Sequence, residues 1–245
     1  MRKNSIFSVQ EKHGHSDIVT DHDLWVQEYL TGRLLDRYPE HGVLGEEKTG
    51  THGVSDWSWV IDPIDGTTNY CQYGRDYAIS LALLYDGVPR YGMVLDVEKE
   101  HLYEGSGIPL DQPLPPDEDP KYGILHMGFK TMRDFTQMGA DPYALAESFR
   151  GMRYSGCASL ELCGISEEKC GLYVNTHLKL WDFAGAYSIL RSRNCRMAVV
   201  RMEDDSYFVC AYRSPTLFRQ CFPLFPEFIQ QKLNETGGIF TYASN

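Results

Sequence analysis

The sequence predicts an α+β protein, and three observations lead to that prediction. A helical pattern spans residues 20–37, an Asp86-Gly87 pair stands between two apolar runs, and strand-like and helix-like segments alternate after residue 120. An Asp-Gly pair between apolar runs is a strong β-hairpin signal. We therefore expect a helix with an antiparallel sheet in residues 1–120, followed by an α/β layer with a partly parallel sheet in residues 121–245.

The first half opens with a helix start at Thr20, which can act as the N-cap while Asp23 completes a capping box. Apolar residues at near-helical spacing continue this helix to about Arg37. The apolar run from Trp57 predicts a strand that ends on Asp62, because the following proline cannot donate to the ladder. Further strands are expected over residues 77–85, 88–97 and 101–104.

The second half begins after residues 111–120, a stretch with four prolines and four acidic residues that predicts a loop and a subdomain boundary. The pattern then predicts strands near residues 122–129, 153–155, 172–175, 196–201 and 207–212. It predicts helices near residues 143–150, 160–169, 182–193 and 223–233.

Composition narrows the class of protein. The net charge of −11 argues against a nucleic-acid groove, which needs a basic face. The N-terminus has no apolar core of a signal peptide, and no run approaches the length of a membrane span. Seven scattered cysteines without a Cys-x-x-Cys pair are typical of reduced thiols. We expect a cytoplasmic protein that does not bind nucleic acid or membranes.

Residues 59–69, which read Trp-Val-Ile-Asp-Pro-Ile-Asp-Gly-Thr-Thr-Asn, are the most informative segment. Asp62 and Asp65 place two carboxylates at the end of one strand with the Ile64 carbonyl between them, a set of hard oxygen ligands suited to Mg²⁺. The turn at Gly66 and Thr67 offers backbone N–H groups that could hold a phosphate, above all if a helix begins there. This layout is typical of a metal-assisted phosphatase, and a plain polar turn is the alternative.

The same run resembles the inositol monophosphatase family, whose pattern is a hydrophobic residue followed by Asp-Pro-x-Asp-Gly-Thr/Ser. Three further segments match that family in order: Asp17-Ile-Val-Thr-x-x-Asp23, Gly45-Glu-Glu47 and Trp181-Asp182. Taken alone, the acids of the last two have plainer explanations, as solvated loop residues and as a helix N-cap. Together the matches imply the layered αβαβα sandwich of the inositol monophosphatase and fructose-1,6-bisphosphatase type, and Mg²⁺-dependent hydrolysis of a small phosphate monoester.

The resemblance implies two or three Mg²⁺ ions. It gives one ion to Glu46, Asp62 and the Ile64 carbonyl, and a second to Asp62, Asp65 and Asp182. Most of these ligands lie in residues 1–120, and the last one lies in residues 121–245 together with substrate contacts. A haloacid dehalogenase phosphatase also carries an Asp-Gly-Thr run, but it has one residue between its acids, and here two residues separate them.

The resemblance also implies catalytic roles for Glu46, Asp23 and Thr67. Glu46 contacts the attacking water, while Asp23 and Thr67 orient that water and help to deprotonate it. Glu47 is expected beside the site or exposed. Lys12 matches a family lysine on a loop beside the metals, and a solvated surface lysine is nearly as good an explanation.

Substrate contacts are expected from Gly66 and Thr67, and from Gly156 and Ala158 in a segment similar to the family's Gly-x-Ala. The family glutamate that contacts inositol hydroxyls is replaced by Asn175, which loses a charge-assisted hydrogen bond. This change resembles bacterial members with a broad substrate range. The candidate substrates are inositol monophosphate, the 2′-phosphate of NADP(H), a sugar bisphosphate and 3′-phosphoadenosine 5′-phosphate.

Two departures from the family pattern leave alternatives open. Only eleven residues precede Lys12 where the family has a helix, and Gly105-Ser-Gly107 stands in place of a longer glycine-rich hairpin. Family members are often dimers, and a homodimer remains open here. A non-catalytic phosphate-ligand binder or regulatory relative is the alternative function, although every metal-ligand position and the Asp23/Thr67 pair are present.

Overall fold

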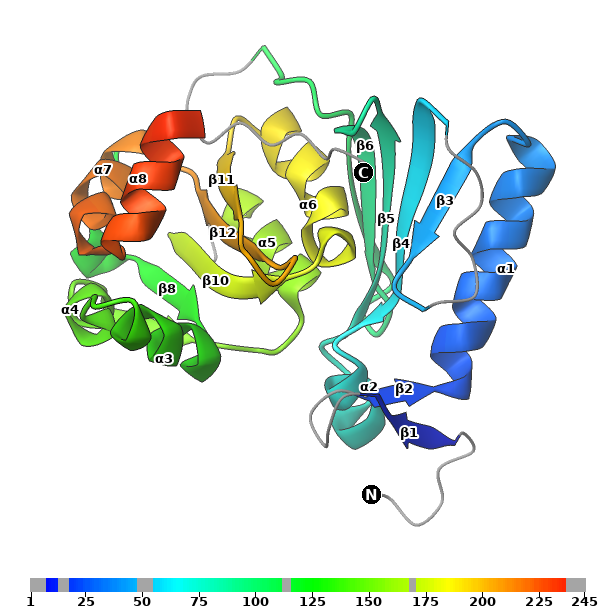
Figure 1. Ribbon diagram of the computed structural model, residues 1–245, viewed down its shortest axis with the longest axis horizontal. Helices are drawn as coiled ribbons and strands as arrows, with labels where there is room; N and C mark the ends of the chain where they lie inside the picture. The colour runs from blue at the N-terminus through cyan, green and yellow to red at the C-terminus, as the bar shows by residue number, and fades with distance from the viewer. Residues whose placement is uncertain (1–7, 13–17, 48–54, 112–115, 168–170, 237–245) are drawn as a thin grey trace.

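The structure, a computed structural model, describes residues 8–12, 18–47, 55–111, 116–167 and 171–236. Its helices and two five-stranded sheets alternate in five layers (Figure 1). Three apolar clusters fill the interfaces between those layers. The predicted α+β class and the layered αβαβα sandwich are therefore confirmed.

The first sheet has the strand order β3-β4-β5-β6-β7. Its strands are β3 (Gly42–Gly45), β4 (Trp57–Asp65), β5 (Ala78–Tyr85), β6 (Val88–Asp96) and β7 (His101–Gly105). The β3–β4 pair is parallel and the other pairs are antiparallel. Asp86 and Gly87 join β5 to β6 with positive φ angles of 48° and 70°, so the predicted hairpin is confirmed.

Strand β4 does not end at Asp62, and that prediction is wrong. The strand continues to Asp65, but its pairing with β5 shifts register between Asp62 and Asp65. Pro63 lies inside this irregular stretch, where its missing N–H does not interrupt a regular ladder. The irregularity keeps both carboxylates buried at the same end of the strand.

Helix α1 (Asp21–Arg37) forms the outer layer on this sheet. Thr20 caps the helix and Asp23 closes the predicted capping box, so both the start and the end of this helix are confirmed. Leu30 and Leu34 pack on the cluster formed by Val43, Trp59 and Ile61, which lies on β3 and β4. Helix α1 therefore covers the strands that lead into the acidic motifs.

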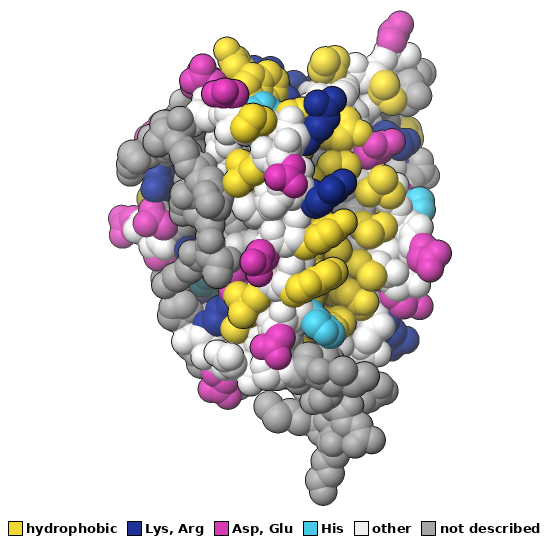
Figure 2. All heavy atoms as spheres, turned by 90° about the vertical axis from the view of Figure 1, so that its right-hand side faces the viewer, with side chains coloured by type: hydrophobic (Ala, Val, Ile, Leu, Met, Phe, Trp, Pro, Cys, Tyr) yellow, Lys and Arg dark blue, Asp and Glu magenta, His cyan; other side chains and the backbone are white. Residues whose placement is uncertain are grey.

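An apolar groove of about 500 Å³ lies between α1 and the neighbouring strands. Trp25 and Tyr29 stack with ring centroids 5.5 Å apart and are 62% and 54% exposed. Figure 2 shows the hydrophobic side chains that gather on this face of the molecule. At the lower end of α1 in Figure 1, β1 (Val9–Glu11) pairs with β2 (Ile18–Thr20) beside α2 (Thr67–Tyr73).

Helices α5 (Ala158–Ser166) and α6 (Leu180–Ser192) fill the layer between the two sheets. Gly185 on α6 lies so close to Gly92 on β6 that a Cβ atom on Gly92 would approach the Gly185 carbonyl oxygen to 2.0 Å. Small residues therefore allow the helix to touch the strand backbone. This close packing places the start of α6 beside the end of β4.

The second sheet has the order β11-β12-β10-β8-β9, and the pairs of β8 with β10 and β9 are parallel, which confirms the partly parallel layer. Its strands are β8 (Ile124–Met127), β9 (Gly151–Arg153), β10 (Leu172–Leu178), β11 (Arg196–Arg201) and β12 (Tyr207–Tyr212). Its outer helices are α3 (Phe129–Gln137), α4 (Pro142–Glu147), α7 (Pro215–Cys221) and α8 (Glu227–Thr236), with 3-10 turns at Pro120–Tyr122 and Phe222–Leu224.

Two helices of this outer layer were not predicted. The sequence prediction extended a strand to Phe129, but β8 ends at Met127 and Phe129 begins α3. The mostly polar sequence of α3 hides its short apolar face, on which Phe135 is fully buried. Helix α7 was also missed, and α8 begins later than expected, at Glu227.

Six of the seven cysteines fall in the described residues, and these six are free thiols, five of them buried. Cys170 and part of the predicted 111–120 loop lie outside the described residues. In the part of the chain that the structure describes, no helix is long and apolar enough to span a bilayer.

Candidate active site

Four carboxyl groups, from Glu46, Asp62, Asp65 and Asp182, lie near one another where β3, β4 and α6 meet. Burial raises the pKa of Asp62 well above its usual range, and the charges of Glu46, Asp65 and Asp182 raise it further. Burial also raises the pKa of Asp182, with Asp65 and Glu46 as the next causes. The negative charge of each acid therefore disfavours ionisation of its neighbours.

The donor set of this cluster fits a hard cation. The side-chain donors are carboxylate oxygens, and the Ile64 carbonyl lies between two of the acids, which is the ligand type that Mg²⁺ prefers. A bound cation would also offset the mutual repulsion that raises these pKa values. As the side chains lie within the described ranges, no group of three or more His, Cys, Asp or Glu residues is arranged to hold a metal ion.

The carboxylate of Asp65 links the two halves of the molecule. Its Oδ2 accepts hydrogen bonds from the N–H and hydroxyl of Ser159, both at 2.6 Å, and from the thiol of Cys157 at 3.3 Å. Its Oδ1 accepts from the Ala158 N–H at 3.2 Å. Burial raises the pKa of Asp65, while the bonds from Ser159 oppose that rise. Asp65 therefore holds the first turn of α5 against the end of β4.

Asp182 is not the N-cap of its helix, so the plainer structural explanation for this residue is wrong. Helix α6 begins at Leu180, and Asp182 occupies its third position. There its Oδ2 accepts the Lys179 N–H at 2.7 Å. This bond fixes the side chain at the start of α6, beside the acids of the first sheet.

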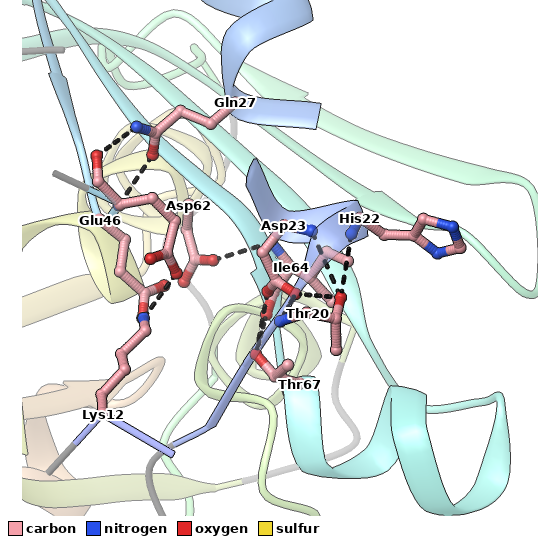
Figure 3. Close-up of polar contacts among 10 residues, drawn as sticks. Lys12, Thr20, His22, Asp23, Gln27, Glu46, Asp62, Ile64 and Thr67 are labelled. Atoms are coloured by element: carbon pink, nitrogen blue, oxygen red, sulfur yellow. Dashed lines mark hydrogen bonds and ion pairs between the residues drawn. The ribbon is translucent and has the colours of Figure 1, made fainter. Parts of the chain in front are cut away.

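The Gly45-Glu46-Glu47 segment is held by a glutamine on α1 (Figure 3). Gln27 accepts the Glu47 N–H through Oε1 at 2.9 Å and donates through Nε2 to the Glu47 carbonyl. A Cβ atom at Gly45 would lie 2.2 Å from the Gln27 Oε1, so any other residue there would displace the Gln27 side chain from its bonds to Glu47. Gln27 thereby sets the position from which the Glu46 side chain extends toward Asp62.

Lys12 supplies the positive charge nearest to these acids in the described structure (Figure 3). Its Nζ lies 3.0 Å from Glu46 Oε1 and 2.5 Å from Glu47 Oε1. Burial raises the pKa of Glu46, and the Lys12 charge opposes that rise. Lys12 therefore lies beside the acids and is not a solvated surface lysine. Glu47 is buried, with 6% of its surface exposed.

Asp23 and Thr67 are brought together from α1 and α2 (Figure 3). The Thr67 hydroxyl lies 3.3 Å from Asp23 Oδ1 and 2.9 Å from the Ile64 carbonyl oxygen, either of which can accept its single proton. The other oxygen of Asp23 accepts the N–H of Thr20 at 2.8 Å and the Thr20 hydroxyl. The capping box of α1 thus fixes an acid that is fully buried.

The turn after Asp65 requires a glycine. Gly66 has φ of 85° and is the N-cap of α2. From the sequence, a helix at this point was only a possibility. A Cβ atom there would lie 3.2 Å from the Asp76 carbonyl oxygen and 3.2 Å from Cys157 Cβ. Asn69 then donates to the carbonyls of Asp76 and Ser155, both at 2.8 Å, which ties the turn to the second half of the chain.

A cleft of about 210 Å³ opens beside Asp65 and Asp182, and it brings together the remaining predicted substrate residues. These are Gly156, Ala158 and Asn175. The Ala158 N–H is bonded to Asp65, so this group is already used within the protein.

The Asn175 side chain is also engaged in the fold. Its Oδ1 accepts the His177 N–H at 2.9 Å, and its Nδ2 donates to the Tyr173 hydroxyl at 3.2 Å. Beside these two bonds, the second Nδ2 proton and the second lone pair of Oδ1 can still contact a ligand.

Three groups of residues near the site were missed by the sequence prediction. Gln27 lies four residues after Asp23 on the buried face of α1, and this polar pair at helical spacing was an available signal. Ser159 gave no signal, because its partner Asp65 is 94 residues away. Phe129 and Tyr154, which line the cleft, were assigned to strands.

Comparison with known proteins identifies relatives over most of the chain. The model of the inositol monophosphatase family matches residues 2–213. The inositol-1-monophosphatase of Bacillus subtilis is 29% identical over 192 residues, which cover 75% of this chain and 72% of that protein. A putative Nus factor SuhB of Neisseria meningitidis serogroup B is 32% identical over 189 residues, 72% of this chain and 71% of the relative.

Solved structures show the same fold. Inositol monophosphatase-II from Staphylococcus aureus superposes with a TM-score of 0.72 and 25% identity, over 87% of this chain and 84% of that one. A structure described as an IMPase/NADP phosphatase with Mg²⁺ and phosphate gives a TM-score of 0.75 at 24% identity, over 97% and 90% of the two chains.

Proposed function

Since the chain belongs to the inositol monophosphatase family and is a phosphatase, we propose that it hydrolyses a small phosphate monoester with Mg²⁺ as cofactor. The observation that supports this most directly is a group of four mutually repelling carboxyl groups beside a cleft, of which Asp62 and Asp65 are buried and Glu46 and Asp182 are half-buried. Such a cluster is costly for the folded chain unless a cation offsets it. The candidate substrates are inositol monophosphate, NADP(H), a sugar bisphosphate and 3′-phosphoadenosine 5′-phosphate.

We propose that Glu46, Asp62, Asp65, Asp182 and the Ile64 carbonyl hold two or three Mg²⁺ ions. Bound Mg²⁺ supplies Lewis-acid activation of water and neutralises charge on the phosphoryl oxygens. In the overall reaction, a water oxygen bonds to phosphorus, the phosphorus–oxygen ester bond breaks, and the alcohol leaves with a proton. The chain's own residues position these groups, which is the larger part of catalysis in phosphoryl transfer.

Thr67 and Asp23 act on the water. Since the Thr67 hydroxyl donates a hydrogen bond to Asp23 or to Ile64, its lone pairs remain free to accept a hydrogen bond from water. When the water attacks, Thr67 would take up its proton and pass the hydroxyl proton to Asp23, which acts as the general base and is held by Thr20. Glu46 would contact the same water, and Lys12 keeps its carboxylate oriented.

The N-terminus of α2 at Gly66 and Thr67 would receive the phosphate oxygens, because its first N–H groups lack a side-chain cap. Gly156 and Asn175 would contact the alcohol part of the substrate from the far wall of the cleft.

A regulatory, non-catalytic role is the second candidate, because some relatives carry the name Nus factor. Phosphate release with Mg²⁺, and with EDTA in its place, separates the two functions. We expect Mg²⁺-dependent release from at least one of the four candidate substrates. Release from none of them, with Mg²⁺ binding intact by calorimetry, would favour the regulatory relative.

A further inference from the structure

One buried carboxylate at the cleft has no role in the proposed chemistry. Glu161 on α5 lines the cleft together with Asp65, and only 4% of its surface is exposed. It also lines a second pocket of about 160 Å³. In the described part of the chain no lysine or arginine pairs with Glu161, and His126 Nδ1 lies 3.5 Å from its Oε1. Burial of a carboxylate is costly unless hydrogen bonds stabilise it, so the partners of Glu161 indicate its function.

Glu161 holds the first residue of the turn that leads into α5. Its Oε1 accepts the Ser155 N–H, and Asn69 Nδ2 donates to the Ser155 carbonyl at 2.8 Å. Both backbone polar groups of Ser155 are therefore bonded to side chains, one from α5 and one from α2. Gly156 follows with φ of 83°, a conformation that favours glycine, and the chain enters α5 two residues later.

The same turn carries the groups that hold Asp65. The N–H groups of Ala158 and Ser159 donate to the Asp65 carboxylate at 3.2 and 2.6 Å. Only a few bonds of backbone separate these donors from Ser155, so a shift of Ser155 would move them as well. The hydrogen bond from Ser155 to Glu161 therefore restrains the position of the Asp65 carboxylate through the backbone of residues 155–159.

We propose that Glu161 is a positioning residue for Asp65: its carboxylate fixes the backbone of residues 155–159, and that backbone orients Asp65 toward the cation. This proposal rests on the proposed metal site and adds a residue that touches neither metal nor substrate. Hydrogen bonds to a charged acceptor are stronger than neutral ones, so a carboxylate suits a turn that must keep its place. A purely structural Glu161 would stabilise the start of α5 and leave Asp65 unaffected.

Amide hydrogen exchange of Ala158 and Ser159, followed by NMR in EDTA, tests the proposal without metal or activity. In Glu161→Ala both amides should exchange about 10-fold faster than in wild type, the change that loss of one hydrogen bond to a charged group gives. The dissociation constant for Mg²⁺, measured by calorimetry, should rise about 10-fold. Glu161→Gln should restore most of both quantities, because its amide oxygen can still accept the Ser155 N–H.

Asp96→Ala is the matched control. Asp96 is 3% exposed, lines the same second pocket as Glu161 and also accepts a backbone N–H, from Lys99 at 3.2 Å. Its bonds lie in the turn between β6 and β7 rather than in the segment that holds Asp65. Asp96→Ala should therefore lower the melting temperature and leave both the exchange of the two amides and the Mg²⁺ affinity unchanged.

Three outcomes would overturn the role of Glu161: unchanged amide exchange in Glu161→Ala, an equal change in Asp96→Ala, or faster exchange with wild-type Mg²⁺ affinity. If Glu161→Ala does not fold, the same measurements on Glu161→Asp decide, because its shorter carboxylate keeps the charge and withdraws from Ser155. Phosphate release by the wild-type protein tests the proposed function separately. Its absence, with the exchange and Mg²⁺ results as expected, would contradict the phosphatase and still support the positioning of Asp65 by Glu161.

Discussion

The two walls of the cleft are built in different ways. Asp65 lines the cleft from the first half of the chain, where Asp23, Gln27 and Asp62 are buried and bonded to backbone or side-chain partners. On the other wall, Phe129 and Tyr154 are exposed. The first wall can hold reacting groups to within a small tolerance, whereas the second can change without unfolding the protein. We therefore expect substitutions on the second wall to change substrate choice more than the rate of the chemical step.

The largest expected effect comes from Asp65, which belongs to both walls. Asp65→Asn should lower turnover by more than the roughly 100-fold typical of residues that only support a metal ligand. It should also destabilise the protein by about 1–3 kcal/mol, because an amide cannot accept all the bonds from the start of α5. Phosphate release and thermal unfolding in EDTA measure the two effects.

Asp62→Asn separates the loss of a metal ligand from the loss of the hydrogen bonds to α5. It should lose turnover to the same degree and leave the metal-free protein at least as stable as wild type, because it removes one of four repelling charges. Asp36→Asn, on the exposed side of α1, should change neither quantity. Near-normal turnover in Asp65→Asn would remove the proposed metal site.

Thr67 tests the proposed activation of water without changing any of the four acids of the cluster. Thr67→Ala should lower kcat about 100-fold and leave KM nearly unchanged, because the hydroxyl acts on the attacking water rather than on substrate binding. Steady-state kinetics with inositol 1-phosphate measure both constants. Thr67→Ser keeps the hydroxyl and should restore most of the rate. A large rise in KM with a normal kcat would show that Thr67 binds substrate instead.

The sequence predicted the first wall better than the second, for a physical reason. Asp62, Ile64 and Asp65 sit within four residues, so the chain itself keeps them together. The contacts of Asp65 with Ser159 and of Asn69 with Ser155 close loops of more than 80 residues, which no local pattern reports. The resemblance to a known family supplied Asp182, which spacing alone could not have placed.

The sequence prediction missed the helix that begins at Phe129 for another reason. The polar face of α3 masked its helical period, so Phe129 was placed at the end of a strand and its position at the cleft was not foreseen. The buried polar stripe of α1 was visible in the sequence, and only Asp23 of that stripe was used. Polar residues on the buried face of a helix are therefore worth following beyond the first motif match.

Gln27 tests how Glu46 is positioned, and the expected loss of turnover is smaller than for the acids. Gln27→Leu should lower turnover about 10- to 100-fold, because it frees the backbone that carries Glu46. The Mg²⁺ concentration for half-maximal activity should rise. Glu28→Leu, on the exposed side of the same helix, should leave that concentration unchanged. If both variants keep the wild-type Mg²⁺ dependence, Gln27 supports only the fold.

Asn175 should give the smallest effect and the most specific one, because it lies on the wall that we propose contacts the alcohol part of the substrate. Asn175→Glu adds a charged acceptor for a hydroxyl group, so the ratio of kcat/KM for inositol 1-phosphate over adenosine 2′-monophosphate should rise about 5- to 30-fold. Asn175→Asp is the matched variant, since its shorter carboxylate can still accept the His177 N–H and keep the turn. A ratio that rises in Glu but not in Asp would show that reach toward the substrate matters, and a ratio unchanged in both would show that Asn175 serves the turn alone.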